Sequence, residues 1–440
     1  MDFIGWRERF EELRRAHGVP GASLAVLADG RVQALATGVL NTGTGVEATT
    51  DSLFQIGSIT KVYTATAVMQ LVEQGLTTLD TPVVEVLPEF RVADADVSAR
   101  VTLRHLLTHT SGINGDPVID AGRGDDCLAR FVEGCAEVTQ CHPLGDRFSY
   151  CNAGYSILGR VIERLTGSVW DTALRELVLD PAGLDHSWTL PEDVLRFRAA
   201  MGHLRHDDQQ RPAPSWGLPR SDGPAGLLCA TASDVVTFAK LHADGALPGL
   251  AEMRRPQVAV PNTDGTTPAW GLGWTLYDWG RPVHGHDGGT IGQSAVLRVI
   301  PDAGVAVALL GNTDVFGAFY RQVFAELLES LCGVTTPAPL APPDSPVEVE
   351  LERHVGVYER MGLRAEVSFH DGRLKTRVVR TDVYAVLQPP YETDLVAVAD
   401  GRFLEQVPGT TRWQPTAFVT AADGTDYLYL GYLALRKLDA

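Results

Sequence analysis

The stretch Phe54-Gln-Ile-Gly-Ser-Ile-Thr-Lys61 carries a Ser-x-x-Lys tetrad at the start of a predicted helix over residues 59–74. Residues three apart on a helix share a face, so Lys61 can reach the Ser58 hydroxyl. A serine hydroxyl is a poor nucleophile until a neighbouring base takes its proton. With only four lysines and sixteen serines in 440 residues, chance would produce such a tetrad roughly 0.15 times per chain. The tetrad therefore predicts an activated serine.

Two further short motifs follow in the chain. Tyr150-Cys-Asn152 precedes a predicted helix that ends at Gly167, and His286-Asp-Gly-Gly289 lies much later. Together with the tetrad, they resemble the Ser-x-x-Lys, Tyr-x-Asn and Lys/His-x-Gly motifs of the serine β-lactamase and penicillin-binding-protein superfamily. Residues 54–57, 102–112 and 270–274 look like the class C branch of that superfamily. The resemblance covers roughly residues 10 to 330.

This resemblance implies an α/β fold of the β-lactamase/transpeptidase type over residues 1–335, an antiparallel sheet flanked by helices with an all-α subdomain. Local patterns agree with it. Apolar spacing predicts a helix over residues 3–16, and Asp29-Gly30 predicts a hairpin between strands at 22–28 and 31–39. Further strands are predicted at 271–276, 294–300 and 305–310, then a helix at 318–331. Residues 76–215 are predicted to be mostly helical and rich in loops.

A Pro-rich linker over residues 336–347 marks a domain boundary, and the texture of the chain changes after it. Short alternating runs separated by Asp-Gly turns predict an antiparallel, up-and-down β-barrel over residues 348–440. The runs are residues 365–369, 374–379, 383–387, 395–399, 417–420 and 427–435. This part resembles the lipocalin-like domain of some superfamily members. The sequence leaves two roles open for this domain: structural support of the catalytic domain, or control of substrate access.

The resemblance implies a role for each motif residue. Ser58 would attack an acyl carbonyl, with its own backbone N–H and that of Gly289 stabilising the oxyanion. Either a neutral Lys61 or an ionised Tyr150 could take the serine proton, and the sequence leaves this open. Tyr150 would return the proton to the leaving group. Asn152 would orient Lys61 and donate a hydrogen bond to a substrate amide oxygen.

His286 departs from the pattern of β-lactamases, which hold a lysine there to anchor a substrate carboxylate. Histidine is mostly neutral near pH 7, and relatives with histidine tend to be esterases, D-amino-acid peptidases or acyltransferases. Strong β-lactamase activity is therefore not expected. Asp287 could raise the pKa of His286, bind a substrate amine or cap a turn. Gly288 completes the triplet beside the oxyanion donor.

Other signals are weaker. His284 and His286 lack a third ligand at zinc-like spacing, so neither a metal nor another cofactor is predicted. His109 and Ser111 invite a triad interpretation, but they lie in a stretch that resembles a structural loop. Arg436 could clamp a substrate carboxylate from the barrel, or be a solvated charge. Sequences typical of other hydrolases and of nucleotide-binding proteins are absent.

The net charge of −18 disfavours nucleic acids and anionic membranes as partners. The amino terminus has no apolar signal-peptide core, and no apolar run is long enough to span a bilayer. The six cysteines form no Cys-x-x-Cys pair and are expected to be free thiols. We therefore expect a cytoplasmic protein.

The predicted function is that of a serine hydrolase or acyltransferase that forms an acyl-Ser58 intermediate from esters or from peptides with D-residues. The alternative is a standalone thioesterase of the penicillin-binding-protein type, which would release and macrocyclise a non-ribosomal peptide from a carrier protein. A β-lactamase or a non-catalytic penicillin-binding-like receptor is a weaker interpretation. The partner would be a small peptide or ester, or a carrier-bound peptidyl thioester.

Overall fold

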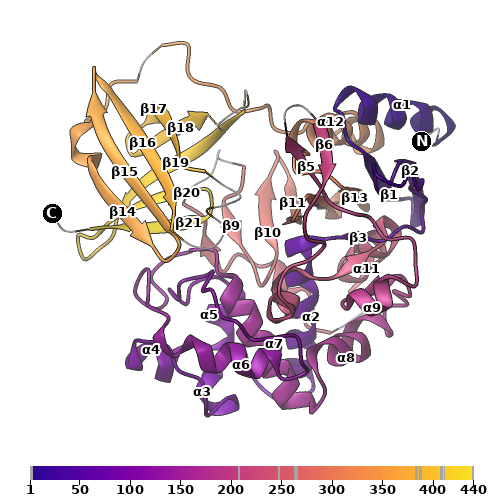
Figure 1. The fold of residues 1–440 in the computed structure, drawn as a ribbon, viewed down its shortest axis with the longest axis horizontal. Helices are drawn as coiled ribbons and strands as arrows, with labels where there is room; N and C mark the ends of the chain where they lie inside the picture. Colours follow the sequence, from indigo (N-terminus) through magenta and orange to yellow (C-terminus); the bar gives the residue numbers. More distant parts are fainter. Residues whose placement is uncertain are drawn as a thin grey trace.

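An eight-stranded antiparallel sheet combines strands from the start of the chain with strands from residues 258–311 (Figure 1). The computed structural model describes residues 3–206, 209–245, 248–261, 266–345, 347–381, 385, 389–406, 410 and 412–438. The strand order is β2-β1-β13-β12-β11-β10-β9-β8. The strands are β1 (Gly21–Ala28), β2 (Arg31–Gly38), β8 (Val258–Ala259), β9 (Ala269–Trp270), β10 (Thr275–Asp278), β11 (Pro282–Thr290), β12 (Gln293–Ile300) and β13 (Val305–Gly311). The predicted α/β class is confirmed.

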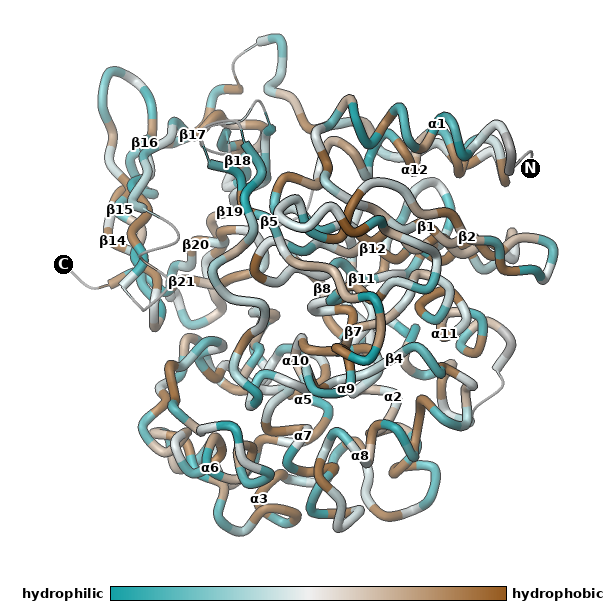
Figure 2. The backbone as a smooth tube through the Cα atoms, turned by 45° about the vertical axis from the view of Figure 1, so that its right-hand side comes forward, coloured by the Kyte–Doolittle hydropathy of each residue, from teal (hydrophilic) through white to brown (hydrophobic). Residues whose placement is uncertain are grey.

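Helices cover both faces of this sheet because its central strands carry apolar side chains on both faces. In β13, Val307 and Leu309 pack with α1 (Phe3–Ala16) and α12 (Gly317–Cys332). Figure 2 shows α1 and α12 side by side beside β1. Ala306 and Ala308 belong to the opposite cluster, with α2 (Thr60–Glu73) and α11 (Ala232–Asp244).

Helices and longer loops make up the region between residues 76 and 215, which is as rich in loops as predicted but less helical. The helices lie together below the sheet in Figure 1. They are α3 (Val83–Val86), α4 (Ala95–Arg100), α5 (Leu103–Leu107), α6 (Cys127–Gly134), α7 (Asn152–Thr166), α8 (Trp170–Leu174) and α9 (Pro191–Val194). A hairpin, β5 (His203–His206) with β6 (Gln209–Pro212), was not predicted. Another small sheet joins β3 (Phe54–Gln55), β7 (Cys229–Ala230) and β4 (Ser187–Trp188). This small sheet holds the backbone of β3, which leads directly to Ser58.

The carboxyl-terminal strands close into a barrel in chain order, which is the predicted up-and-down arrangement. They are β14 (Gly356–Arg360), β15 (Leu363–His370), β16 (Arg373–Arg380), β17 (Tyr391–Ala399), β18 (Arg402–Gln406), β19 (Trp413–Thr420), β20 (Asp426–Leu430) and β21 (Leu433–Lys437). β14 pairs with β21 to complete the closure.

Two predicted strands are wrong in extent, and glycine is the reason in both. Residues 271–276 hold a turn between β9 and β10, where Gly273 has φ +80° and a Cβ would lie 2.9 Å from the Cβ of Ala65. Residues 427–435 form two strands, because Gly431 turns the chain with φ +54°. Strands β11, β14 and β18 were missed. The predicted run at 383–387 lies largely outside the described residues.

All six cysteines are free thiols. No helix within the described ranges is long and apolar enough to cross a bilayer.

Leu309→Ala should lower the free energy of unfolding by about 2–5 kcal/mol. The reason is that the Leu309 side chain is 0% exposed and packs from β13 into the cluster with α1 and α12. The matched control is Leu195→Ala, at a leucine that is 77% exposed, which should change stability by less than about 0.5 kcal/mol. Urea denaturation of the purified proteins measures both. Equal losses for the two variants would contradict the assignment of the core.

Candidate active site

Ser58 lies in a single 3-10 turn, Gly57–Ile59, directly before α2. The first turn of α2 brings Lys61 back toward it, and Lys61 Nζ lies 3.1 Å from Ser58 Oγ. The side chain of Lys61 is 0% exposed, and its Nζ also donates to the carbonyl oxygen of Ala225 at 2.6 Å. Burial lowers the Lys61 pKa to about 7, against the opposing effect of Asp116 and Asp222. A large share of the lysine is therefore a neutral amine near pH 7.

Tyr150 lies beside Ser58, and both residues line the same cavity. Lys61 Nζ lies 4.9 Å from the centroid of the Tyr150 ring. Burial raises the Tyr150 pKa well above its usual value, so the side chain is a phenol at neutral pH. Ser58 thus has both a buried amine and a phenol close to it.

His109, which sequence reasoning assigned to a structural loop, supports Tyr150 directly. Its ring stacks on that of Tyr150, with centroids 4.3 Å apart. Its Nδ1 accepts a hydrogen bond from Cys151 N at 3.0 Å, and its carbonyl oxygen accepts one from Ser149 N at 2.9 Å. Ser111 Oγ instead accepts from Ile113 N in its own turn. The triad interpretation is not supported, but His109 belongs to the site.

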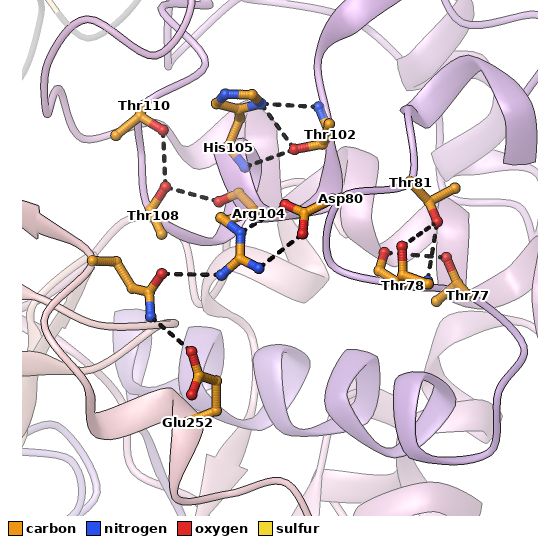
Figure 3. A network of polar contacts seen from close by, with 11 residues as sticks. Thr77, Thr78, Asp80, Thr81, Thr102, Arg104, His105, Thr108, Thr110 and Glu252 are labelled. Atoms are coloured by element: carbon orange, nitrogen blue, oxygen red, sulfur yellow. Dashed lines mark hydrogen bonds and ion pairs between the residues drawn. The ribbon is translucent and has the colours of Figure 1, made fainter.

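A polar network holds the turn that carries His109 (Figure 3). Arg104 donates to both oxygens of Asp80, at 2.8 and 3.0 Å. Thr102 and His105 form a capping box at the start of α5. Thr108 Oγ1 donates to Arg104 O at 2.8 Å and bonds to Thr110 Oγ1 at 2.9 Å. The left-handed backbone of His109, with φ +58°, is therefore fixed on both sides.

His286 presents a hydrogen-bond acceptor to the site. Its Nδ1 lies 2.6 Å from the carbonyl oxygen of Asp287, which can only accept, so the proton is on Nδ1. Its Nε2 is buried without a hydrogen-bond partner. Burial, and then Lys61, lowers the His286 pKa to about 4. A neutral ring with a lone pair on Nε2 cannot anchor a carboxylate.

Asp287 forms an ion pair with Arg298 across strands β11 and β12. The Arg298 side chain is only 4% exposed and lies over the ring of Tyr277. Of the three roles proposed for Asp287, one is confirmed in direction, because Asp287 raises the His286 pKa. Its carboxylate also neutralises the buried Arg298. The effect of Asp287 on the His286 pKa is smaller than that of burial.

Glycines let β11 approach the nucleophile turn. A Cβ on Gly288 would lie 1.9 Å from Ile56 O and 3.1 Å from Ser58 N. A Cβ on Gly57, which has φ +52°, would lie 2.4 Å from Gly289 N. The backbone nitrogens of Ser58 and Gly289 therefore lie at the same junction, where an oxyanion could accept from both.

Asn152 begins α7, and its Nδ2 donates to Asp116 Oδ1 at 2.6 Å. The predicted contact with Lys61 is not formed. The carbonyl oxygen of Ala225 holds the lysine instead. A backbone acceptor far away in the sequence gives no signal that sequence reasoning could have used.

Ser58 opens into a cavity of about 460 Å³. Its lining consists of Ser58, Gly115, Asp116, Pro117, Val118, Ile119, Phe131, Tyr150, Asn152, Ala153, Leu218, Pro219, Ser221, Asp222, Ala225, Gly226, Gly289, Arg380 and Leu433. The last two come from the barrel, which therefore forms part of the cavity wall. Arg436 is exposed on β21 and is not in this lining. The structure places Arg380 there instead.

Among the described residues, no group of three or more His, Cys, Asp or Glu side chains is arranged to hold a metal. His284 packs edge-on against Trp274, with centroids 4.9 Å apart, and burial lowers its pKa to about 3.

This fold is that of the β-lactamase and penicillin-binding superfamily of serine hydrolases. Residues 6–329 match the sequence model of the family described as Beta-lactamase, and the chain belongs to that family. It is 52% identical to penicillin-binding protein 4 of Amycolatopsis lactamdurans over 376 residues, 82% of this chain and 99% of the relative. Esterase EstB of Burkholderia gladioli is 30% identical over 69% of this chain and 88% of its own length.

A solved structure matches the barrel as well as the catalytic part. The crystal structure of SurE superposes with a TM-score of 0.81 and 30% identity, over 99% of both chains. SurE crystallised with D-Leu superposes with a TM-score of 0.77 and 31% identity, again over 99% of both chains.

Gly288→Ala should lower the melting temperature and slow the reaction of Ser58 with a fluorophosphonate probe at least about tenfold, because the new methyl group would push β11 away from the nucleophile turn. Gly289→Ala is the matched control for stability, since a Cβ there meets nothing within 4 Å. Thermal melts and labelling time courses measure both effects. Wild-type stability and labelling of Gly288→Ala would contradict the close approach.

Proposed function

We propose that this protein is a serine hydrolase or acyltransferase that forms an acyl-Ser58 intermediate from esters and from peptides with D-residues. One observation carries the proposal. Ser58 Oγ lies 3.1 Å from a fully buried lysine amine, lies beside Tyr150 and opens into a cavity of about 460 Å³.

In the acylation step, neutral Lys61 accepts the Ser58 proton while Oγ bonds to the substrate carbonyl carbon. The carbonyl electron pair moves to oxygen, and the Ser58 and Gly289 N–H groups donate to that oxyanion. As the intermediate collapses, the bond to the leaving group breaks and Tyr150 donates its proton to that group. Protonated Lys61 then returns a proton to Tyr150. Water or an amine repeats the steps on the ester.

The charges favour Lys61 over Tyr150 as the base. The Lys61 pKa is lowered to about 7, whereas that of Tyr150 is raised by burial. Lys61 is therefore available as a neutral base. Tyr150 stays a protonated phenol, which suits a general acid.

The pH dependence of catalysis tests this choice. Below about pH 7 Lys61 is protonated and cannot accept the serine proton, so kcat/KM for a p-nitrophenyl ester should fall about tenfold per pH unit. A rate profile from pH 5 to pH 9 measures it, with Ser58→Ala as the blank. A profile that still rises about tenfold per pH unit up to pH 9, or one that is flat down to pH 5, would contradict a neutral lysine base.

The substrate class is argued from the cavity wall. Asp116 and Asp222 line it, and the neutral His286, which is not in the lining, stands where a lysine cation is expected in β-lactamases. Burial, and then Asp116, raises the Asp222 pKa to about 6, so Asp222 is still ionised at neutral pH. These groups favour a substrate ammonium and disfavour a carboxylate beside the reacting bond. The D-Leu bound to SurE and the esterase relative support D-residues and esters as acyl groups.

A cytoplasmic location stays a prediction.

Asp222→Asn should lower the preference for a free amine about tenfold. The measured quantity is the ratio of kcat/KM for D-phenylalanine p-nitroanilide to that for its N-acetyl derivative at pH 7. Taking a ratio cancels any effect of the substitution on Lys61. A ratio equal to that of the wild type would exclude Asp222 as the ammonium partner.

A second candidate is the thioesterase that cyclises a carrier-bound peptide, because the barrel forms part of the cavity wall and the full-length likeness to SurE includes it. A covered cavity favours an amine over water as the acyl acceptor. Incubation with a D-residue-containing peptidyl thioester of N-acetylcysteamine, followed by mass spectrometry, tests it. Turnover of p-nitrophenyl esters and D-amino-acid anilides without any cyclic product would remove this candidate.

A further inference from the structure

The segment Phe148–Asn152, which carries Tyr150 and Asn152, is held by hydrogen bonds from the carboxyl-terminal barrel. Tyr429 Oη donates to Phe148 O at 2.9 Å. Tyr150 N donates to the carbonyl oxygen of Tyr432, also at 2.9 Å, and the two tyrosine rings stack with centroids 6.5 Å apart. The β20–β21 hairpin thus bonds to the backbone on both sides of Ser149.

Ser149 is the second point of contact. Its Oγ accepts from Ala434 N of β21 at 3.2 Å and from Arg360 Nη1, at the end of β14, at 3.4 Å. Both bonds are buried and link residues more than two hundred positions apart. They fix the residue directly before Tyr150.

Arg360 also reaches Asn152 through Asp116. Its side chain is 1% exposed, and Nη2 lies 3.9 Å from Asp116 Oδ2. Asp116 Oδ1 in turn accepts from Asn152 Nδ2 at 2.6 Å. Gly115 is needed for this approach, because a Cβ there would lie 2.9 Å from Arg360 Nη2 and 2.8 Å from Tyr150 O. One buried guanidinium therefore contacts partners of both Tyr150 and Asn152.

We infer that Arg360 is a positioning residue for the reaction, and that the barrel holds Tyr150 and Asn152 in place as well as walling the cavity. The inference rests on the proposed acyl transfer by Ser58. Residues 148–151 belong to no helix or strand, so their backbone depends on bonds from outside. His109 supplies them from the catalytic side, and the barrel supplies the rest. Small displacements of catalytic groups by distant changes can cost about a hundredfold in rate.

The competing role for the barrel is substrate contact alone, and Arg380 in the cavity wall represents it. A substrate contact acts mainly on KM, whereas loss of positioning acts on kcat and on the reactivity of Ser58 itself. The split between the two parameters therefore separates the roles.

The experiment compares the full-length wild type with Arg360→Met, Arg360→Lys and the matched control Arg377→Met. Arg377 lies on the barrel surface, with its side chain 48% exposed in ion pairs with Glu366 and Glu392. Hydrolysis of p-nitrophenyl acetate gives kcat and KM, and a fluorophosphonate gives the rate of Ser58 modification. Arg360→Met should lower kcat and the modification rate at least about tenfold with KM within about threefold. Arg360→Lys should recover part of the loss, and Arg377→Met should match the wild type.

A wild-type kcat and modification rate in Arg360→Met would overturn the inference, and so would a rise in KM alone. If Arg360→Met does not fold, Ser149→Ala tests the same contacts by removing the shared acceptor, and the same two outcomes decide. A wild type that neither hydrolyses the ester nor reacts with the phosphonate refutes the proposed function instead.

Discussion

The burial of one amine determines the rest of this site. Lys61 sits in a helix whose residues from Thr60 to Leu71 are all buried, and water is excluded from its Nζ. A charged ammonium loses its hydration there, so the neutral form is favoured even though Asp116 and Asp222 attract the charge. One N–H of the neutral amine donates to Ala225 O, and the lone pair can accept from the Ser58 hydroxyl. The fold must therefore exclude water from this helix while leaving Ser58 accessible from a cavity.

Two structural features meet this requirement, which is to bury Lys61 while Ser58 stays accessible. Glycines in β11 and in the nucleophile turn let two backbones touch, so the oxyanion donors need no side chain. The barrel and the loop of His109 then close on Tyr150 from opposite sides. Because the barrel approaches through backbone bonds and one buried arginine, it can shape the cavity wall and hold the catalytic segment together. The proposed preference for cationic groups rests on the acidic side chains of the wall, Asp116 and Asp222.

Much of this could be predicted from the sequence, since local patterns carry it. The three motifs appear in order, and the helix after Ser58, the hairpin at Asp29-Gly30 and the barrel follow from periodicity and turn residues. Strand β11 was missed because its glycines lower strand propensity, although close approach requires them. The bonds of Asn152 to Asp116 and of Lys61 to Ala225 were missed because they join residues that only the tertiary fold brings together. Arg436 was preferred to Arg360 and Arg380 because sequence position alone does not show which barrel arginines face the site.

The ionisation of Lys61 can be measured directly, because the chain has only four lysines. Labelling lysine with carbon-13 at Cε should give four resonances, and the one absent from Lys61→Arg belongs to Lys61. The account predicts that this resonance titrates with a pKa of about 7. A Lys61 resonance that instead titrates near the ordinary lysine value of about 10.4 would contradict the central claim that Ser58 is activated by a buried neutral amine.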